Sequence, residues 1–153
     1  MINTGYFACL HKYPQNETFL VVSRTYPRWL KKGYSWHPEL APSPKLLKDR
    51  KNGGITWQEY TRRYKEEMKT PQAQDSIIHL ATWSAADTFR LLCYEKEWPC
   101  HRFILKELIE KVEESMTLKI NGAVISPTVA SNSRDVSKEP RGSSDKHRTE
   151  VSE

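Results

Sequence analysis

The segment RLLCYEKEWPCHRFILKELIEK, Arg90 to Lys111, carries the clearest signals for both fold and function. It opens with an apolar run of strand length and closes with apolar residues spaced as on one face of a helix. Pro99 stands between the two, and proline is favoured at the first position of a helix. We therefore predict a strand that ends near Glu95, a short connection, and a helix that starts near Cys100. The apolar face of that helix would comprise Ile104, Leu105, Leu108, Ile109 and Val112.

Reactive side chains gather on both sides of this connection. Cys93 and Glu95 fall on one face of the predicted strand, at the carboxyl end where open α/β sheets bind ligands. Cys100, His101 and Arg102 fill the first helical turn, whose unpaired N–H groups and positive dipole end attract anions. Cys100 is a candidate low-pKa nucleophile with His101 or Glu95 as its base, and Cys93 is a second catalytic candidate. The alternative is that these cysteines are buried thiols that only fill the core.

Arg102 is unfavourably placed for helix stability. A cation in the first turn opposes the helix dipole by roughly 0.3–1 kcal/mol, so a nearby anion should offset it. Glu95 or Glu97 could supply that anion as an ion pair, and a bound ligand could do so instead.

A metal site is a weaker interpretation of the same segment. Cys9 and His11 could complete a set of four ligands with Cys93 and Cys100. Structural zinc prefers paired short spacings such as C-x₂₋₄-C, and none occurs here. Neighbouring residues such as Cys100 and His101 also rarely point at one metal. We therefore predict neither a metal nor a cofactor.

The rest of the chain alternates between strands and helices. Residues 18–22 are apolar and β-branched, as in a strand, and residues 57–68 place aromatic residues at helical spacing. Another helix is expected after Asp75 or Ser76, and Asn121-Gly122 between two apolar runs predicts a C-terminal hairpin. This order predicts a small α/β domain with a mostly parallel sheet flanked by helices.

Length and composition indicate the domain organisation and the cellular compartment. The 153 residues predict a single domain over 1–125, followed by a disordered tail over 126–153 that is rich in Ser and charge and lacks aromatic residues. No apolar run reaches the ~20 residues of a membrane span, and the N-terminus has no basic leader. Three cysteines, an odd number, favour reduced thiols and a cytoplasmic location. The net charge of +5 suits an anionic partner, although it equally serves solubility.

Five segments resemble the family called domain of unknown function 488, in the same order. They are NTGYFACLHKYP, VVSRTYPRW, ELAPSPKLL, WQEYTRRYKEEM and LLCYEKEWPCHR, and together they span about residues 2–112. The last contains the C-x-E and C-H-R signature of that family. The resemblance implies a Rossmann-like α/β domain in which Arg24, Cys93, Glu95, Cys100, His101 and Arg102 gather at the carboxyl ends of neighbouring strands. It implies no particular activity.

Three functions follow from these patterns. The first, which we favour, is a pocket for a phosphate or nucleotide-like anion that could be enzymatic, with Arg24 and Arg102 as the anion-binding residues. The second is a nucleic-acid-binding module that uses the basic aromatic loop over 23–44. In the third, the cluster has no catalytic role and only locks the strand to the helix, with Glu95 paired to Arg102 or Arg24. The sequence predicts no membrane partner and no particular oligomeric state.

Overall fold

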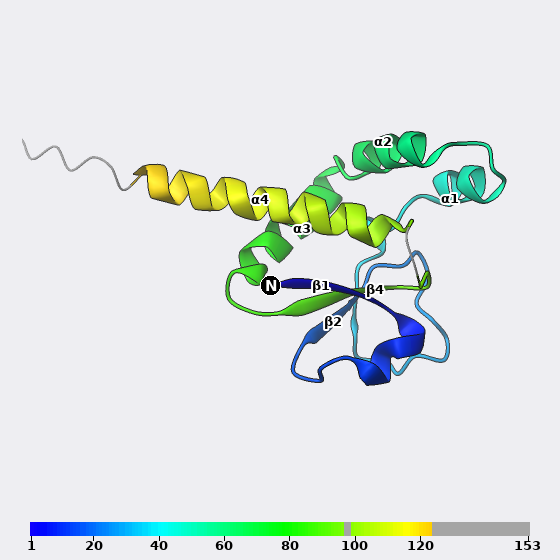
Figure 1. The fold of residues 1–153 in the computed structure, drawn as a ribbon, viewed down its shortest axis with the longest axis horizontal. Coiled ribbons are helices and arrows are strands. Elements are labelled where there is room, and N and C mark those ends of the chain that lie inside the picture. Colours follow the sequence, from blue (N-terminus) through cyan, green and yellow to red (C-terminus); the bar gives the residue numbers. More distant parts are fainter. Residues whose placement is uncertain (97–98, 124–153) are drawn as a thin grey trace, which may run out of the picture.

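Four parallel strands form the sheet, and every described α-helix lies on one side of it (Figure 1). The computed structural model describes residues 1–96 and 99–123. The elements in chain order are β1 (Ile2–Tyr6), η1 (Phe7–Lys12), β2 (Thr18–Val21), β3 (Ser35–Trp36), η2 (Pro38–Leu40), α1 (Pro44–Lys51), α2 (Trp57–Glu67), α3 (Pro71–Ser84), β4 (Phe89–Cys93) and α4 (His101–Ala123). The predicted α/β fold with a parallel sheet is confirmed.

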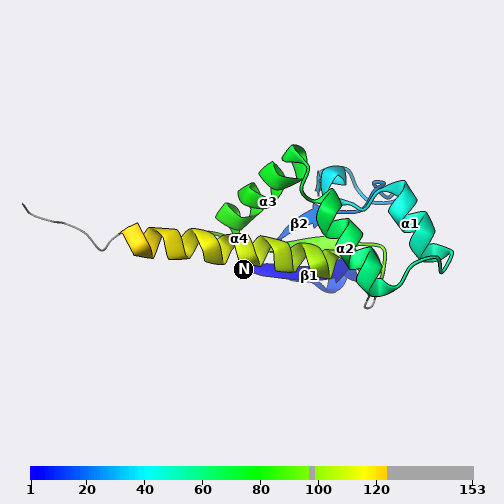
Figure 2. The same ribbon diagram turned by 90° about the horizontal axis from the view of Figure 1, so that it is seen from above.

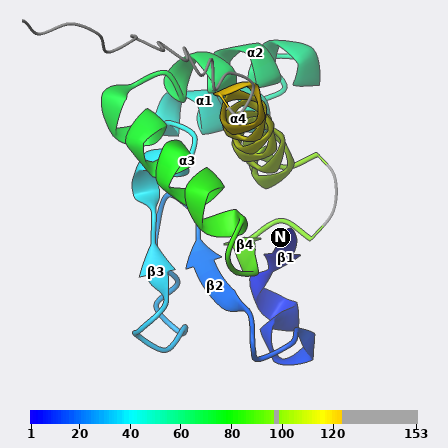
Figure 3. The same ribbon diagram turned by 90° about the vertical axis from the view of Figure 1, so that its left-hand side faces the viewer.

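In the sheet, β4 lies between β1 and β2. The strand order is β1-β4-β2-β3, and Figure 3 shows the strands side by side in this order. In register, Tyr6 lies opposite Cys93, and Val21 lies opposite Leu92. The carboxyl ends of β1, β2 and β4 therefore meet at one edge, and this edge receives the loop that leads from β4 into α4.

One face of the sheet forms the main core with the helices. Side chains alternate along each strand, so Leu20 and Val22 of the β2 segment and Leu91 of β4 point to the helical layer. The aromatic stripe predicted for α2 is confirmed, since Tyr60, Tyr64 and Met68 are buried in this core with Trp57 packed against it. Figure 2 shows α2, α3 and α4 lying over the strands.

The opposite face is covered by non-helical segments. Phe19, Val21 and Leu92 point away from the helices and pack with Phe7 of η1 and Leu30 of the long loop. This second, smaller core explains why the loop that follows β2 holds a defined shape although it contains several prolines.

Two predictions about these helices were wrong. The hairpin predicted at Asn121-Gly122 is not formed, because α4 continues through both residues. Helix α3 starts at Pro71, so Asp75 and Ser76 lie inside it and are not caps. In both cases an uninterrupted helix keeps its backbone groups paired, which outweighs the local turn and cap preferences.

The predicted helix start near Cys100 is confirmed within one residue, whereas the end of the strand and the place of Pro99 differ from the prediction. β4 ends at Cys93 and α4 begins at His101, so Pro99 precedes the helix and is not its first residue. The structure adds α1, which the sequence analysis left within an undefined region. Within the described ranges, no helix is both long and apolar enough to span a bilayer. The predicted tail over 126–153 lies outside the described residues.

Candidate functional site

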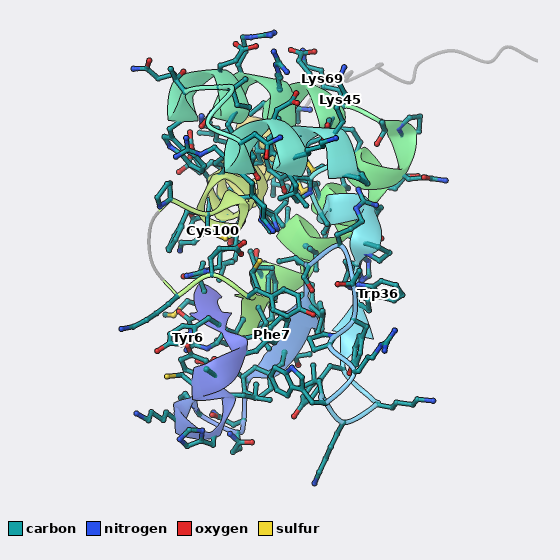
Figure 4. The ribbon with its side chains drawn as sticks, turned by 90° about the vertical axis from the view of Figure 1, so that its right-hand side faces the viewer. Tyr6, Phe7, Trp36, Lys45, Lys69 and Cys100 are labelled. Atoms are coloured by element: carbon teal, nitrogen blue, oxygen red, sulfur yellow. The ribbon has the colours of Figure 1, made fainter. Side chains whose placement is uncertain are left out.

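The candidate site lies where β4 ends and α4 begins. Cys93 is the last residue of β4 and points to the helical side of the sheet, and Cys100 immediately precedes α4. Figure 4 shows Cys100 between the sheet and the helices. Cys93, Cys100 and His101 are each at least 96% buried. The topology thus brings residues from both sides of the loop into one place, as the sequence pattern predicts.

Four side chains converge there within hydrogen-bonding range. The Cys93 thiol donates to Oε2 of Glu95 at 2.8 Å, and the Cys100 sulfur lies 3.6 Å from the same oxygen. Nδ1 of His101 lies 3.7 Å from the Cys100 sulfur and 3.9 Å from the Cys93 sulfur. The ligand atoms of all four side chains therefore lie close together, and Glu95 is the exposed residue of the four.

His101 is held in a single orientation by the sheet. Its Nε2 lies 2.9 Å from the carbonyl oxygen of Val22, just beyond the end of β2. Because that oxygen can only accept, Nε2 carries the proton and donates. Nδ1 is the ring nitrogen that faces the two sulfurs. The ring also packs edge-on against Tyr64, with the ring centroids 5.6 Å apart.

The two thiols have opposite tendencies to ionise. The adjacent Cys93 thiol, together with His101 and a backbone N–H, lowers the pKa of Cys100 to about 5. The same pairing with Cys100, together with burial, raises the pKa of Cys93 well above its usual range. Burial raises the pKa of Glu95, but hydrogen bonds from Cys93 and the backbone outweigh it, so the carboxylate is favoured. Cys100 is thus the better nucleophile of the pair.

Arg102 is buried and binds the loop rather than a described carboxylate. Its guanidinium donates to the backbone carbonyl oxygens of Glu95 and Lys96, the second at 2.9 Å. Its Nε has no hydrogen-bond partner among the described residues. The ion pair between Glu95 and Arg102, one of the alternatives that the sequence left open, is not among the contacts of the described residues, and the Glu95 carboxylate accepts from a thiol instead. Glu97 lies outside the described residues.

Arg24 lies elsewhere and does not join the cluster. Its guanidinium donates to the carbonyl oxygens of Ala41 and Pro42 at 3.1–3.2 Å. It lines a different cavity, which also contains Glu39, Ser76 and Glu67. The pairing of Arg24 with Glu95 that the structural alternative required is absent from the described contacts.

A cavity of about 260 Å³ opens above the cluster. Its lining combines the cluster with residues of α1 and α2: Leu47, Arg50, Lys51, Trp57, Tyr60, Glu95, Pro99, Cys100 and His101. Sequence reasoning missed Arg50 and Lys51 because it did not recognise α1. The signal was present, since Ser43 caps that helix and Pro44 occupies its first position.

The aromatic residues of the long loop are divided between core and surface. Tyr26 and Tyr34 pack against the second core, whereas Trp29 is 64% exposed and Trp36 is 44% exposed. The Trp36 indole donates to the carbonyl oxygen of Ser23, which holds one edge of that ring. The predicted stacking surface is thus limited to two tryptophans.

The comparisons with known proteins identify the family. A family model described as the active DUF488-N3 subclade matches residues 6–113. Neither the curated proteins nor the solved structures contained a match to the chain. The matched span holds the whole β4–α4 site and the cationic residues of α1. On this match over most of its length, the chain belongs to the domain of unknown function 488 family.

Proposed function

We propose that the protein binds a small phosphate-bearing or nucleotide-like anion in the cavity above Cys100 and acts on it through that thiol. The supporting observation is that one cavity joins two cations, Arg50 and Lys51, to the Cys100–His101 pair. A cationic rim over a reactive floor is the arrangement that an enzyme for an anionic substrate requires. The description of the matched subclade as active agrees with this.

The anion contacts in this proposal come from α1. Arg50 donates to the carbonyl oxygen of Ile55 at 3.2 Å and lies 6.0 Å from the Trp57 ring centroid, so further guanidinium N–H groups can reach a ligand. Lys51 is exposed at the same rim. Arg24 and Arg102, the residues predicted from the sequence, are less suited because neither lines this cavity: Arg24 lines a different one and Arg102 is buried.

The shape of the cavity favours a compact ligand. Trp57 and Tyr60 stack with their centroids 5.0 Å apart and line one wall, which suits a planar or sugar-like group. The cavity volume of about 260 Å³ is just below the usual range for ligand pockets, about 300–1,000 Å³. Phosphate, sugar phosphates and small nucleotide fragments fit this size best.

The reactive groups then have distinct roles. Cys100 is the candidate nucleophile, because its lowered pKa keeps it as a thiolate at neutral pH. Glu95 and His101 are the candidate proton carriers, within 3.6–3.7 Å of the Cys100 sulfur. Cys93 keeps its proton and orients Glu95. Such thiol chemistry requires a reducing compartment, in line with a cytoplasmic location.

Thermal unfolding with phosphate, sugar phosphates and nucleoside monophosphates tests the proposal. A ligand present at about 100 times its Kd stabilises the folded protein by about 2.7 kcal/mol, a rise in Tm of several degrees. Arg50→Ala and Lys51→Ala should reduce that rise. Lys48→Ala, an exposed cation on α1 outside the cavity lining, should leave it unchanged. If no anion raises Tm, or if all three variants respond alike, the proposal fails.

Nucleic-acid binding is a second candidate, favoured by the exposed Trp29 and Trp36 beside the exposed cations Arg28, Lys31 and Lys32. Base stacking on such tryptophans contributes about 1–3 kcal/mol per base. A single-stranded oligonucleotide should then bind with an affinity that falls steeply with salt and with Trp29→Ala. If the affinity depends neither on the salt concentration nor on Trp29, nucleic-acid binding is rejected.

A further inference from the structure

The cluster at the end of β4 has the composition of a metal site. Ligand atoms of Cys93, Glu95, Cys100 and His101 all lie within 4.8 Å of one another. Two thiolates, an imidazole and a carboxylate are the donors that Zn²⁺ takes in proteins. In the sequence alone, zinc is disfavoured because the cysteines lack a short paired spacing. The fold brings Cys93 and Cys100 together without that spacing, because the loop between β4 and α4 returns the chain to the end of β4.

The distances in the cluster fit a tetrahedral ion. Zn²⁺ bonds of about 2.0–2.3 Å place pairs of ligand atoms about 3.3–3.8 Å apart. Both sulfur–Nδ1 distances, 3.7 and 3.9 Å, and the distance of 3.6 Å from Cys100 to Glu95 lie at or near this range. The thiol–carboxylate contact of Cys93, at 2.8 Å, has to open, and it opens as the thiol loses its proton. The two remaining pairs of ligand atoms lie within 4.8 Å of each other, so they close by at most about 1 Å to reach this range.

The hydrogen bond of His101 is an independent indication. Histidine ligands of metals almost always donate their other ring N–H to a carbonyl or carboxylate, which fixes the tautomer and the ring orientation. His101 makes this contact from Nε2 to the carbonyl oxygen of Val22, at 2.9 Å, and so presents Nδ1 to the cluster. The contact joins the end of β2 to the cluster, so the ligand is oriented before any ion binds.

The net charge of the cluster also favours Zn²⁺. Two thiolates and one carboxylate carry three negative charges, and a bound Zn²⁺ reduces the net charge to −1. The guanidinium of Arg102, which is 98% buried, donates to the carbonyl oxygens of Glu95 and Lys96. It therefore supplies a compensating positive charge next to the cluster while it holds the loop that carries Glu95.

We propose that Cys93, Cys100 and His101 bind Zn²⁺, with Glu95 as a fourth, exchangeable ligand on the cavity side. Glu95 is the exposed member of the four and lines the cavity, so it is the ligand that an incoming group can displace. This inference concerns the floor of the cavity described in the proposed function, and metal binding itself requires no anion. With Zn²⁺ bound, Cys93 is a thiolate and His101 and Glu95 are ligands. The protonated Cys93 and the proton-carrying roles of His101 and Glu95 therefore belong to the zinc-free protein. A zinc-bound Cys100 remains a thiolate at that floor.

The test measures metal binding without any anion present. The full chain is stripped with a chelator, reloaded with Zn²⁺ and desalted, and its zinc content is measured. We expect about one ion per chain. Reloading with Co²⁺ should give a thiolate-to-cobalt charge-transfer band and the intense d–d bands of tetrahedral cobalt. A reloaded wild-type protein without stoichiometric zinc, or a cobalt spectrum without the thiolate band, overturns the proposal.

Variants locate the ion. Cys93→Ser and Cys100→Ser should each weaken zinc affinity more than about 100-fold, the upper end for changes that only affect outer-shell contacts. Cys9→Ser, which removes the third cysteine outside the cluster, should retain full affinity. Equal affinity in all three variants would place the ion elsewhere and reject the site. Because the cobalt spectrum is recorded on wild-type protein, the conclusion does not depend on the variants folding.

The outcomes separate this inference from the proposed function. Stoichiometric zinc with no anion-induced rise in Tm keeps the metal site and rejects the anion pocket. Anion stabilisation of chelator-treated protein that takes up no zinc keeps the pocket and rejects the metal site.

Discussion

At the residue scale, Arg102 illustrates how a position that opposes local helix preference is stabilised by tertiary contacts. A cation in the first turn of α4 opposes the helix dipole. The two loop carbonyls to which it donates offset this cost and fix the connection between β4 and α4. The side chain is therefore a structural support of the cluster and not an exposed anion clamp.

Replacing Arg102 tests this role. Arg102→Ala should lower the free energy of unfolding by about 2–3 kcal/mol, because the charged hydrogen bonds of a buried guanidinium to two loop carbonyls are lost. Arg102→Lys keeps the charge but loses the planar fork, so it should recover only part of that loss. Urea unfolding measures both. A change below about 0.5 kcal/mol for the alanine variant would contradict the role.

At the scale of elements, side-chain hydrogen bonds connect α1 to α2 and η2 to α3. Ser43 caps α1 by accepting the backbone N–H of Leu46, and its own N–H and hydroxyl both donate to the carboxylate of Glu67 at the end of α2. In η2, Glu39 accepts from Ser76 of α3 at 2.7 Å and from His37 at 2.9 Å. These contacts position α1, which carries the cationic rim of the cavity.

The link between α1 and α2 predicts coupled variants. Ser43→Ala should cost about 1 kcal/mol for the cap alone, and more because Glu67 loses a donor. In a double-mutant cycle with Glu67→Ala, the combined cost should fall short of the sum of the two single costs. Unfolding free energies from denaturant titration give the cycle. Strictly additive costs would show that the Ser43–Glu67 contact does not stabilise the protein.

Glu39 predicts a pH effect. Burial raises its pKa, but hydrogen bonds from Ser76, the backbone and His37 outweigh burial, so the pKa of the Glu39 carboxyl is lowered from its usual range. A carboxyl with a depressed folded pKa stabilises the protein above the unfolded value and loses that contribution as pH falls through the folded value. Between about pH 5 and the folded pKa, Glu39→Gln should therefore lose less stability on acidification than wild type. Thermal unfolding across this range measures the difference, and parallel curves would contradict it.

At the scale of the whole molecule, one ion pair joins segments far apart in the chain. Arg90 of β4 donates to Glu17 at 2.7 and 3.1 Å and to the carbonyl oxygen of Thr4 at 2.7 Å. Its guanidinium also lies 4.1 Å from the ring centroid of Tyr13. The pair is largely buried, with side chains 13% and 8% exposed. It therefore connects β1, β4 and the segment that leads into β2.

Removing one partner of this pair should destabilise the whole fold. Glu17→Ala leaves a buried guanidinium without its carboxylate, at a cost of about 3 kcal/mol. Glu66→Ala is the matched control, because Glu66 pairs with Lys69 at the surface and its loss should change little. A lowered urea midpoint for the first variant only is expected. Equal midpoints would show that the Arg90 network does not stabilise the fold.

Much of the fold was predictable because it depends on local pattern. The aromatic stripe of α2 and the apolar runs of β2 and β4 follow from side-chain period and burial. The hairpin prediction failed because a short Asn-Gly signal competes with the hydrogen bonds of a helix that has already formed. Helix α1 was missed because its few apolar residues give a weak amphipathic pattern.

Local sequence pattern was sufficient to predict β2, α2, β4 and α4, the α/β order, and the grouping of Cys93, Glu95, Cys100 and His101 around one short connection. What these residues face depends on the tertiary packing. Packing β4 between β1 and β2 brings the Val22 carbonyl to His101, and packing α1 against α2, which contacts α4, brings Arg50 and Lys51 to the same cavity. These contacts join residues distant in the chain, and their geometry depends on the packed core rather than on local spacing.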